Sequence, residues 1–110
     1  MLFGERIRIL RKQKNISLRK FAQEVDISTT YLSVIETGDI IPAEDKIRTI
    51  AKALGIDEDE LLFEGGKISS EITTIILKCP REFARAIRAM ARLSAPQISK
   101  MAEALNSKIS

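Results

Sequence analysis

The chain of 110 residues lacks histidine and tryptophan and contains a single cysteine, Cys79. Without histidine, neither a Ser-His-Asp nor a Cys-His catalytic arrangement can form. A zinc site needs about four ligands, mostly cysteine and histidine, and an internal disulfide needs a second cysteine. We therefore expect no enzymatic activity, no metal and no cofactor. The low cysteine usage is typical of a reducing cytosol.

Long apolar runs and strand-like alternation are also absent. No run approaches the ~20 apolar residues needed to span a bilayer, and the N-terminus soon becomes charged. Hydrophobic residues make up 45% of the chain and aromatic residues only 5%. Such a composition predicts a globular, cytoplasmic protein without membrane contact, with a core of Ile, Leu, Ala and Val. We expect an all-α fold.

Charge is distributed unevenly along the chain. Residues 1–20 carry seven Lys and Arg against one acid, residues 21–64 carry three against eleven, and residues 65–110 carry eight against three. The acidic middle argues against a uniformly basic surface. A basic patch remains an option at each end.

Apolar spacing and capping residues predict five helices in the first 64 residues. Phe3, Ile7 and Leu10 indicate a helix over 3–14. Ser17 and Ser28 are good N-caps for helices that end near Val25 and at Thr37. The fourth helix is expected to begin near Pro42 and to end before Gly55. A short fifth helix is expected to follow an N-cap at Asp57.

Gly65-Gly66 is the clearest boundary, and three more helices are expected beyond it. Ser69 or Ser70 can cap the first, Pro80 can begin the second, which extends to about residue 92, and Ser94 can cap the third. We expect a domain over 1–64, a hinge over 65–67, and a C-terminal segment over 68–110.

The helices around Val25-Asp26-Ile27 form a helix-turn-helix pattern, in which the second helix enters the major groove of DNA. Leu32 and Ile35 lie on its expected inner side. Its outer side carries Thr29, Thr30 and Ser33, with Val34 beside them. Short hydroxyl side chains permit close approach to base edges, and methyl groups can contact thymine. The alternative is an ordinary solvated helix face.

These motifs resemble the Xre family of phage-repressor-like helix-turn-helix domains over about residues 3–64. The resemblance rests on residues 17–22 and 28–38, the lead-in over 6–11 and the tail over 50–56. It implies a five-helix domain of a sequence-specific transcriptional regulator, a repressor that binds double-stranded DNA. It assigns DNA binding to Arg19, Ser28, Thr29, Thr30, Tyr31, Ser33 and Val34.

Within that set, the resemblance implies base reading by Thr29 and Thr30 and phosphate contacts by Tyr31 and Arg19, which can also reach a base. It further implies an ion pair between Arg11 and Glu36, joining the first helix to the third. Two positions depart from the family pattern. Asp26 stands where the turn usually has glycine, and Leu18 stands where many relatives have glutamine, so one common DNA contact is missing.

The C-terminal segment has more apolar residues than three short helices need. We expect it to dimerise through Ile72, Ile76, Phe83, Ile87, Met90, Ile98, Met101 and Leu105. A homodimer would match a pseudo-palindromic operator. The alternative is that these helices fold back on the N-terminal domain of the same chain.

A second hypothesis is an antitoxin-like interaction protein, whose C-terminal helices bind a toxin while DNA binding autoregulates its operon. A protease or an antirepressor is another partner that the pattern leaves open. Opposite the apolar residues of the second C-terminal helix lies an arginine stripe, Arg81, Arg85, Arg88 and Arg92. This stripe is either a solvated face or a surface for DNA phosphate or an acidic partner, such as the 57–60 run of a second subunit.

Overall fold

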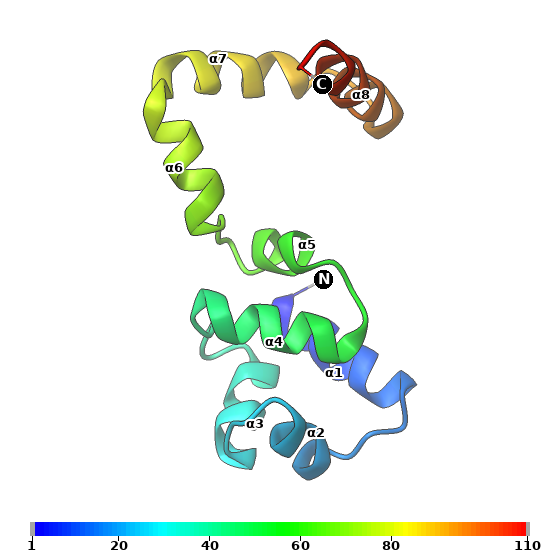
Figure 1. Cartoon of the computed structure of the whole chain (residues 1–110). Helices are drawn as coiled ribbons and strands as arrows, with labels where there is room; N and C mark the ends of the chain where they lie inside the picture. Colours follow the sequence, from blue (N-terminus) through cyan, green and yellow to red (C-terminus); the bar gives the residue numbers. More distant parts are fainter. Residues whose placement is uncertain (1, 110) are drawn as a thin grey trace. The chain divides into compact units, whose positions relative to one another are not determined.

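The computed structural model describes residues 2–109, and every regular element in this range is a helix (Figure 1). The helices are α1 (Phe3–Gln13), α2 (Leu18–Glu24), α3 (Thr29–Thr37), α4 (Glu44–Leu54), α5 (Glu58–Glu64), α6 (Ser70–Lys78), α7 (Pro80–Met90) and α8 (Ala95–Ile109). The all-α prediction is confirmed. Contacts divide the chain into an N-terminal unit up to Ser70 and a C-terminal unit from Glu71, and each is described by itself.

Three helices of the N-terminal unit begin at the caps that the sequence predicts. The Oγ atoms of Ser17 and Ser28 accept hydrogen bonds from the backbone N–H groups of Lys20 and Tyr31, at 3.1 and 3.0 Å. Asp57 caps α5 in the same way. Each cap satisfies an N–H group that has no partner within its helix. Local sequence therefore determines where α2, α3 and α5 begin.

The prediction that a helix begins near Pro42 is corrected. α4 begins at Glu44, after Ala43 in an extended conformation. The Pro42 ring is fully buried in the preceding loop, so it packs against the core and does not open a helix. α7 likewise ends at Met90, two residues before the predicted end.

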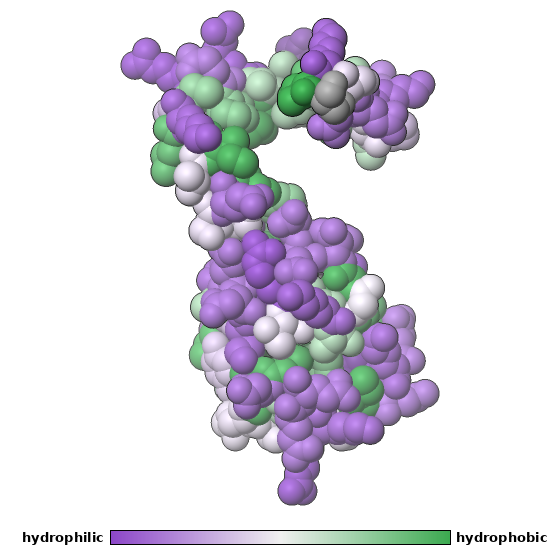
Figure 2. Space-filling view, in the orientation of Figure 1, coloured by the Kyte–Doolittle hydropathy of each residue, from purple (hydrophilic) through white to green (hydrophobic). Residues whose placement is uncertain are grey.

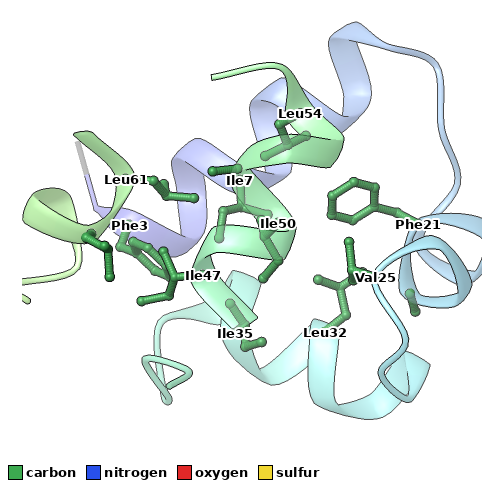
Figure 3. Close-up of a cluster of buried hydrophobic side chains, with 13 residues drawn as sticks. Phe3, Ile7, Phe21, Val25, Leu32, Ile35, Ile47, Ile50, Leu54 and Leu61 are labelled. Atoms are coloured by element: carbon green, nitrogen blue, oxygen red, sulfur yellow. The ribbon is translucent and has the colours of Figure 1, made fainter. Parts of the chain in front are cut away.

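All five helices of the N-terminal unit contribute to one hydrophobic core (Figure 3). Thirteen side chains form it: Phe3, Ile7, Phe21, Ala22, Val25, Leu32, Ile35, Ile47, Ile50, Ala51, Leu54, Leu61 and Leu62. Phe21 lies opposite Val25 and Leu32 in this core and has no exposed surface. Burial of these side chains fixes α2 and α3 on the support of α1 and α4.

Gly4 allows α1 to lie directly against the end of α3. A Cβ atom at this position would lie 2.2 Å from the carbonyl oxygen of Ile35 and 2.7 Å from that of Glu36. No side chain larger than hydrogen fits such an approach without moving the backbone. Gly4 therefore sets the spacing between α1 and α3.

The C-terminal unit has no buried residue in α6, α7 or α8. Figure 2 shows hydrophobic side chains on the surface of α6 and α7. The described residues of all three helices thus leave apolar side chains in contact with solvent. Among residues 2–109, no helix is both long and apolar enough to cross a membrane.

Candidate nucleic-acid interface

The turn between α2 and α3 is held by backbone bonds and by one lysine. Asp26 has φ +58°, the left-handed conformation that glycine adopts most readily. The N–H of Ile27 donates to the Ala22 carbonyl at 3.0 Å, and Lys46 Nζ donates to the Val25 carbonyl at 2.9 Å. Lys46, on α4, therefore provides a hydrogen-bond donor for a carbonyl group at the end of α2. The sequence pattern does not reveal this contact.

α3 presents one apolar side to the core and one hydroxyl-rich side to solvent. Leu32 and Ile35 are fully buried. Thr29 and Thr30 are exposed, and Ser33 and Val34 are half-buried. We call Thr29, Thr30, Ser33 and Val34 the reading face. The first turn of α3, where base contacts are made in helix-turn-helix proteins, thus carries two exposed threonines.

The remaining predicted DNA-binding residues surround the start of each helix. Arg19, the second residue of α2, is exposed, and no ion pair of its side chain occurs within residues 2–109. Ser28 uses its oxygen as the α3 cap. Tyr31 is half-buried and packs against the core. Of the predicted set, Arg19, Ser28, Thr29 and Thr30 are therefore exposed, whereas Tyr31, Ser33 and Val34 are half-buried.

Arg11 and Glu36 form the ion pair that joins α1 to α3. Arg11 Nε and Nη2 donate to the two carboxylate oxygens of Glu36 at 2.8 and 2.9 Å, and Nη1 donates to the Ile16 carbonyl at 2.8 Å. The hydrogen bonds from Arg11 to Glu36 raise the pKa of the guanidinium above its ordinary value. A two-bond pair of this kind restricts both position and orientation.

A basic hollow of about 300 Å³ lies between α1, the first residue of α2 and the outer side of α3. Its lining residues are Arg8, Arg11, Lys12, Leu18, Ser33, Glu36 and Thr37. Arg8 and Lys12 were not among the predicted site residues. Their four-residue spacing places them on one side of α1, but only the packing of α1 against α3 brings that side beside Ser33.

The acidic run at the start of α5 is engaged within the N-terminal unit. Asp57 is a cap, Glu58 pairs with Arg48 at 3.1 Å, and Glu60 pairs with Arg6 at 3.3 Å. Arg6 also pairs with Glu64. Asp59, the remaining residue of the run, is exposed. The four arginines of the stripe are exposed.

The fold and the α2–turn–α3 geometry define a helix-turn-helix DNA-binding protein. The family model described as a helix-turn-helix domain matches residues 4–64. The chain belongs to this family, whose members are DNA-binding transcriptional regulators without enzymatic activity. The predicted resemblance to phage-repressor-like domains is confirmed.

Individual relatives support the same assignment. Over 63 residues, the chain is 43% identical to the control protein C.BamHI of Bacillus amyloliquefaciens, a match of 56% of this chain and 78% of that protein. The crystal structure of the P22 c2 repressor in complex with a synthetic operator is similar at TM-score 0.53 and 31% identity, over 56% of this chain and 92% of that one.

The master regulator of biofilm formation SinR, solved in complex with DNA, is similar at TM-score 0.52 and 29% identity, over 56% of this chain and 98% of that one. Each of these three matches covers 56% of the chain. The family model, over residues 4–64, lies within the N-terminal unit. The assignment as a DNA-binding regulator therefore rests on this unit.

Proposed function

We propose that the protein is a sequence-specific repressor that reads a pseudo-palindromic operator with α3 in the major groove. The observation that carries the proposal is the reading face. It places short hydroxyl and methyl groups in solvent on a helix that the core holds rigidly from its other side. Such groups can approach base edges without a long side chain in between.

Flanking groups would fix the register of α3 on the duplex. Arg19 is exposed at the start of α2, where free backbone N–H groups also favour an anion. Tyr31, the third residue of α3, is half-buried. Contacts with phosphate position a protein, whereas contacts with bases specify the sequence. Arg19 and Tyr31 would do the first, and Thr29 and Thr30 the second.

The active form in this proposal is a homodimer built by the C-terminal unit. Within their own unit, the eight predicted interface residues are all either half-buried or exposed: Ile72, Ile76, Phe83, Ile87, Met90, Ile98, Met101 and Leu105. Burial of this set against a second copy would place two α3 helices on successive major grooves, about 34 Å apart. DNA binding by the N-terminal unit is supported by its similarity to a repressor solved in complex with an operator. The proposed location is the cytoplasm, where chromosomal or phage DNA is accessible.

Base reading is tested by selecting bound sequences from random DNA and repeating the selection with Thr30→Ala. The expected result is a changed base preference at one position of each half-site. Arg19→Gln is expected to weaken binding to all sequences by a similar factor. Thr49→Ala, on α4, is the matched control. An unchanged preference in Thr30→Ala would contradict the assignment of α3 as the reader.

The exposed apolar side chains of the C-terminal unit also support an antitoxin-like function as a second candidate. In that case they would bind a toxin, and DNA binding would regulate the operon of the pair. A protease or an antirepressor would use the same surface. Purification from native cells distinguishes the candidates. A stoichiometric complex with a second protein, in place of a homodimer, would favour the interaction protein.

A further inference from the structure

We propose that Arg8 and Lys12 hold a backbone phosphate of bound DNA in the basic hollow beside α3, an inference that rests on the proposed function. The hollow contains side chains from α1, α2 and α3. It shares Ser33 with the reading face. A helix whose reading face contacts bases lies between two phosphate strands, so a hollow at its edge faces backbone rather than bases.

The charges in the hollow favour an anion. Glu36 is its only acidic lining residue, and both carboxylate oxygens accept hydrogen bonds from Arg11. Arg8 and Lys12 form no ion pair within residues 2–109. Two cationic side chains therefore remain for a ligand of about the charge and size of a phosphate. Arginine can donate two parallel hydrogen bonds to such a group, and lysine adds a point charge.

Two acidic side chains, Glu5 and Asp39, lie close to the hollow without lining it. Glu5 is exposed and lines a neighbouring hollow with Arg8 and Lys12, but it forms no ion pair with either within residues 2–109. Asp39 Oδ2 accepts a hydrogen bond from Thr37 Oγ1 at 3.2 Å, and the same hydroxyl lies 3.0 Å from the Val34 carbonyl. Asp39 is exposed and does not line the hollow. The hollow itself is lined by the cations Arg8, Arg11 and Lys12 and by the acid Glu36, so a net positive charge remains after the Arg11–Glu36 pair.

The proposal also accounts for the first residue of α2, where Leu18 stands in place of the glutamine of the family pattern. Leu18 lines the hollow with an alkyl group that cannot donate a hydrogen bond. Arg8 and Lys12, across the hollow on α1, supply donors on the same side of α3. In this protein we therefore expect α1 to supply the phosphate contact that Leu18 cannot make. Leu18 would form the apolar wall of the site.

The test uses the full-length double variant Arg8→Gln/Lys12→Gln and fluorescence anisotropy with a selected duplex and a scrambled duplex, over a series of salt concentrations. Binding to both duplexes is expected to weaken by at least about 10-fold, since each lost contact involves charged partners. The slope of log K against log salt should fall in magnitude by about 1 to 2. Base preference should not change. The matched control, Lys52→Gln/Lys20→Gln, removes the same charge from exposed positions outside the hollow.

The outcomes separate this inference from the proposed function. If the double variant and the control lose the same affinity and slope, the hollow holds no phosphate, while the proposed function stands. A changed base preference in the double variant would equally overturn the phosphate assignment. If the wild-type chain does not distinguish selected from scrambled DNA, the proposed function fails and the inference fails with it. Thermal melting of each variant verifies that its fold is intact.

Discussion

The two units of the chain differ in where their hydrophobic side chains lie. In the N-terminal unit, helices of 7 to 11 residues enclose Phe21, Leu32 and Ile50 completely. In the C-terminal unit, helices of 9 to 15 residues leave Ile87 and Leu105 half exposed or more. Helix length is therefore not what creates a core. Five helices that converge on one centre bury their apolar sides, whereas α6–α8 bury no residue among themselves, which is why we propose a second copy as their partner.

The largest expected effect comes from removing a core side chain of the N-terminal unit, which tests whether this unit depends on its buried side chains. Phe21→Ala is expected to lower the free energy of unfolding of the N-terminal unit by about 3–5 kcal/mol, because it leaves a cavity at a fully buried position. Chemical denaturation followed by circular dichroism measures the loss. Leu2→Ala, at a side chain that is 65% exposed, is the control and should change little. Equal losses would mean that the core is not organised around Phe21.

A second, somewhat smaller effect is expected at the buried ion pair. Glu36→Gln leaves Arg11 charged, with a side chain only 8% exposed, and should cost about 3 kcal/mol of unfolding free energy. Glu24→Gln, an exposed change of the same charge on α2, should stay within about 0.5 kcal/mol. Denaturation at low and moderate salt measures both. A loss from Glu36→Gln no larger than that of the control would show that the pair contributes no stability.

Substitution of an apolar residue in the C-terminal unit should change the strength of self-association and not the free energy of unfolding. Ile87→Ser is expected to weaken self-association by about 10-fold, because it removes an apolar side chain that the proposed dimer buries. Arg81→Ser, on the opposite side of α7, is the control. Sedimentation equilibrium measures both dissociation constants. A wild-type chain that is monomeric at high concentration, or an Ile87→Ser dimer of unchanged strength, would refute the proposed interface.

The smallest effect concerns pH at the edge of the N-terminal unit. The backbone N–H of Ser70, 2.8 Å from Glu44, and the neighbouring Arg48 hold the pKa of the Glu44 carboxyl below its ordinary value of 4.5. A lowered pKa in the folded chain adds stability above the ordinary value, and that stability is lost as pH falls through the lowered one.

The pH prediction is tested by an NMR titration of the Glu44 side chain and by the variant Glu44→Gln. The titration midpoint of Glu44 should lie below 4.5. Wild type should be the more stable at about pH 7, and the stabilities of the two chains should converge as pH falls through the lowered pKa. A midpoint at or above the ordinary value would contradict the contact between Glu44 and Ser70.

Local signals in the sequence explain which parts of the fold were predictable. Ser17 and Ser28 cap helices through atoms three residues away, so their positions can be read directly. The predicted helix start at Pro42 was wrong because this residue is buried in the loop before α4. The turn at Asp26 depends on Lys46, twenty residues further along the chain. Contacts of that range require the tertiary fold.

The candidate site also contains residues that the sequence predicts and residues that only the tertiary fold reveals. The reading face follows from helical spacing on α3 alone, because Leu32 and Ile35 mark its opposite side. Arg8 and Lys12 look like ordinary surface charges in the sequence. Only the close approach of α1 to α3 at Gly4 brings them beside Ser33. The basic hollow was therefore not predictable from the sequence.

The most direct test compares the full chain with a chain that ends at Ser70, the last residue of the N-terminal unit. Binding of each to the selected operator and to a single half-site is measured beside its sedimentation mass. The full chain is expected to be a dimer and to bind the operator about 100-fold more tightly than the half-site, through two linked contacts. The shorter chain should be a monomer with little difference between the two. A shorter chain that remains dimeric and retains full operator affinity would contradict the division of DNA reading and pairing between the two units.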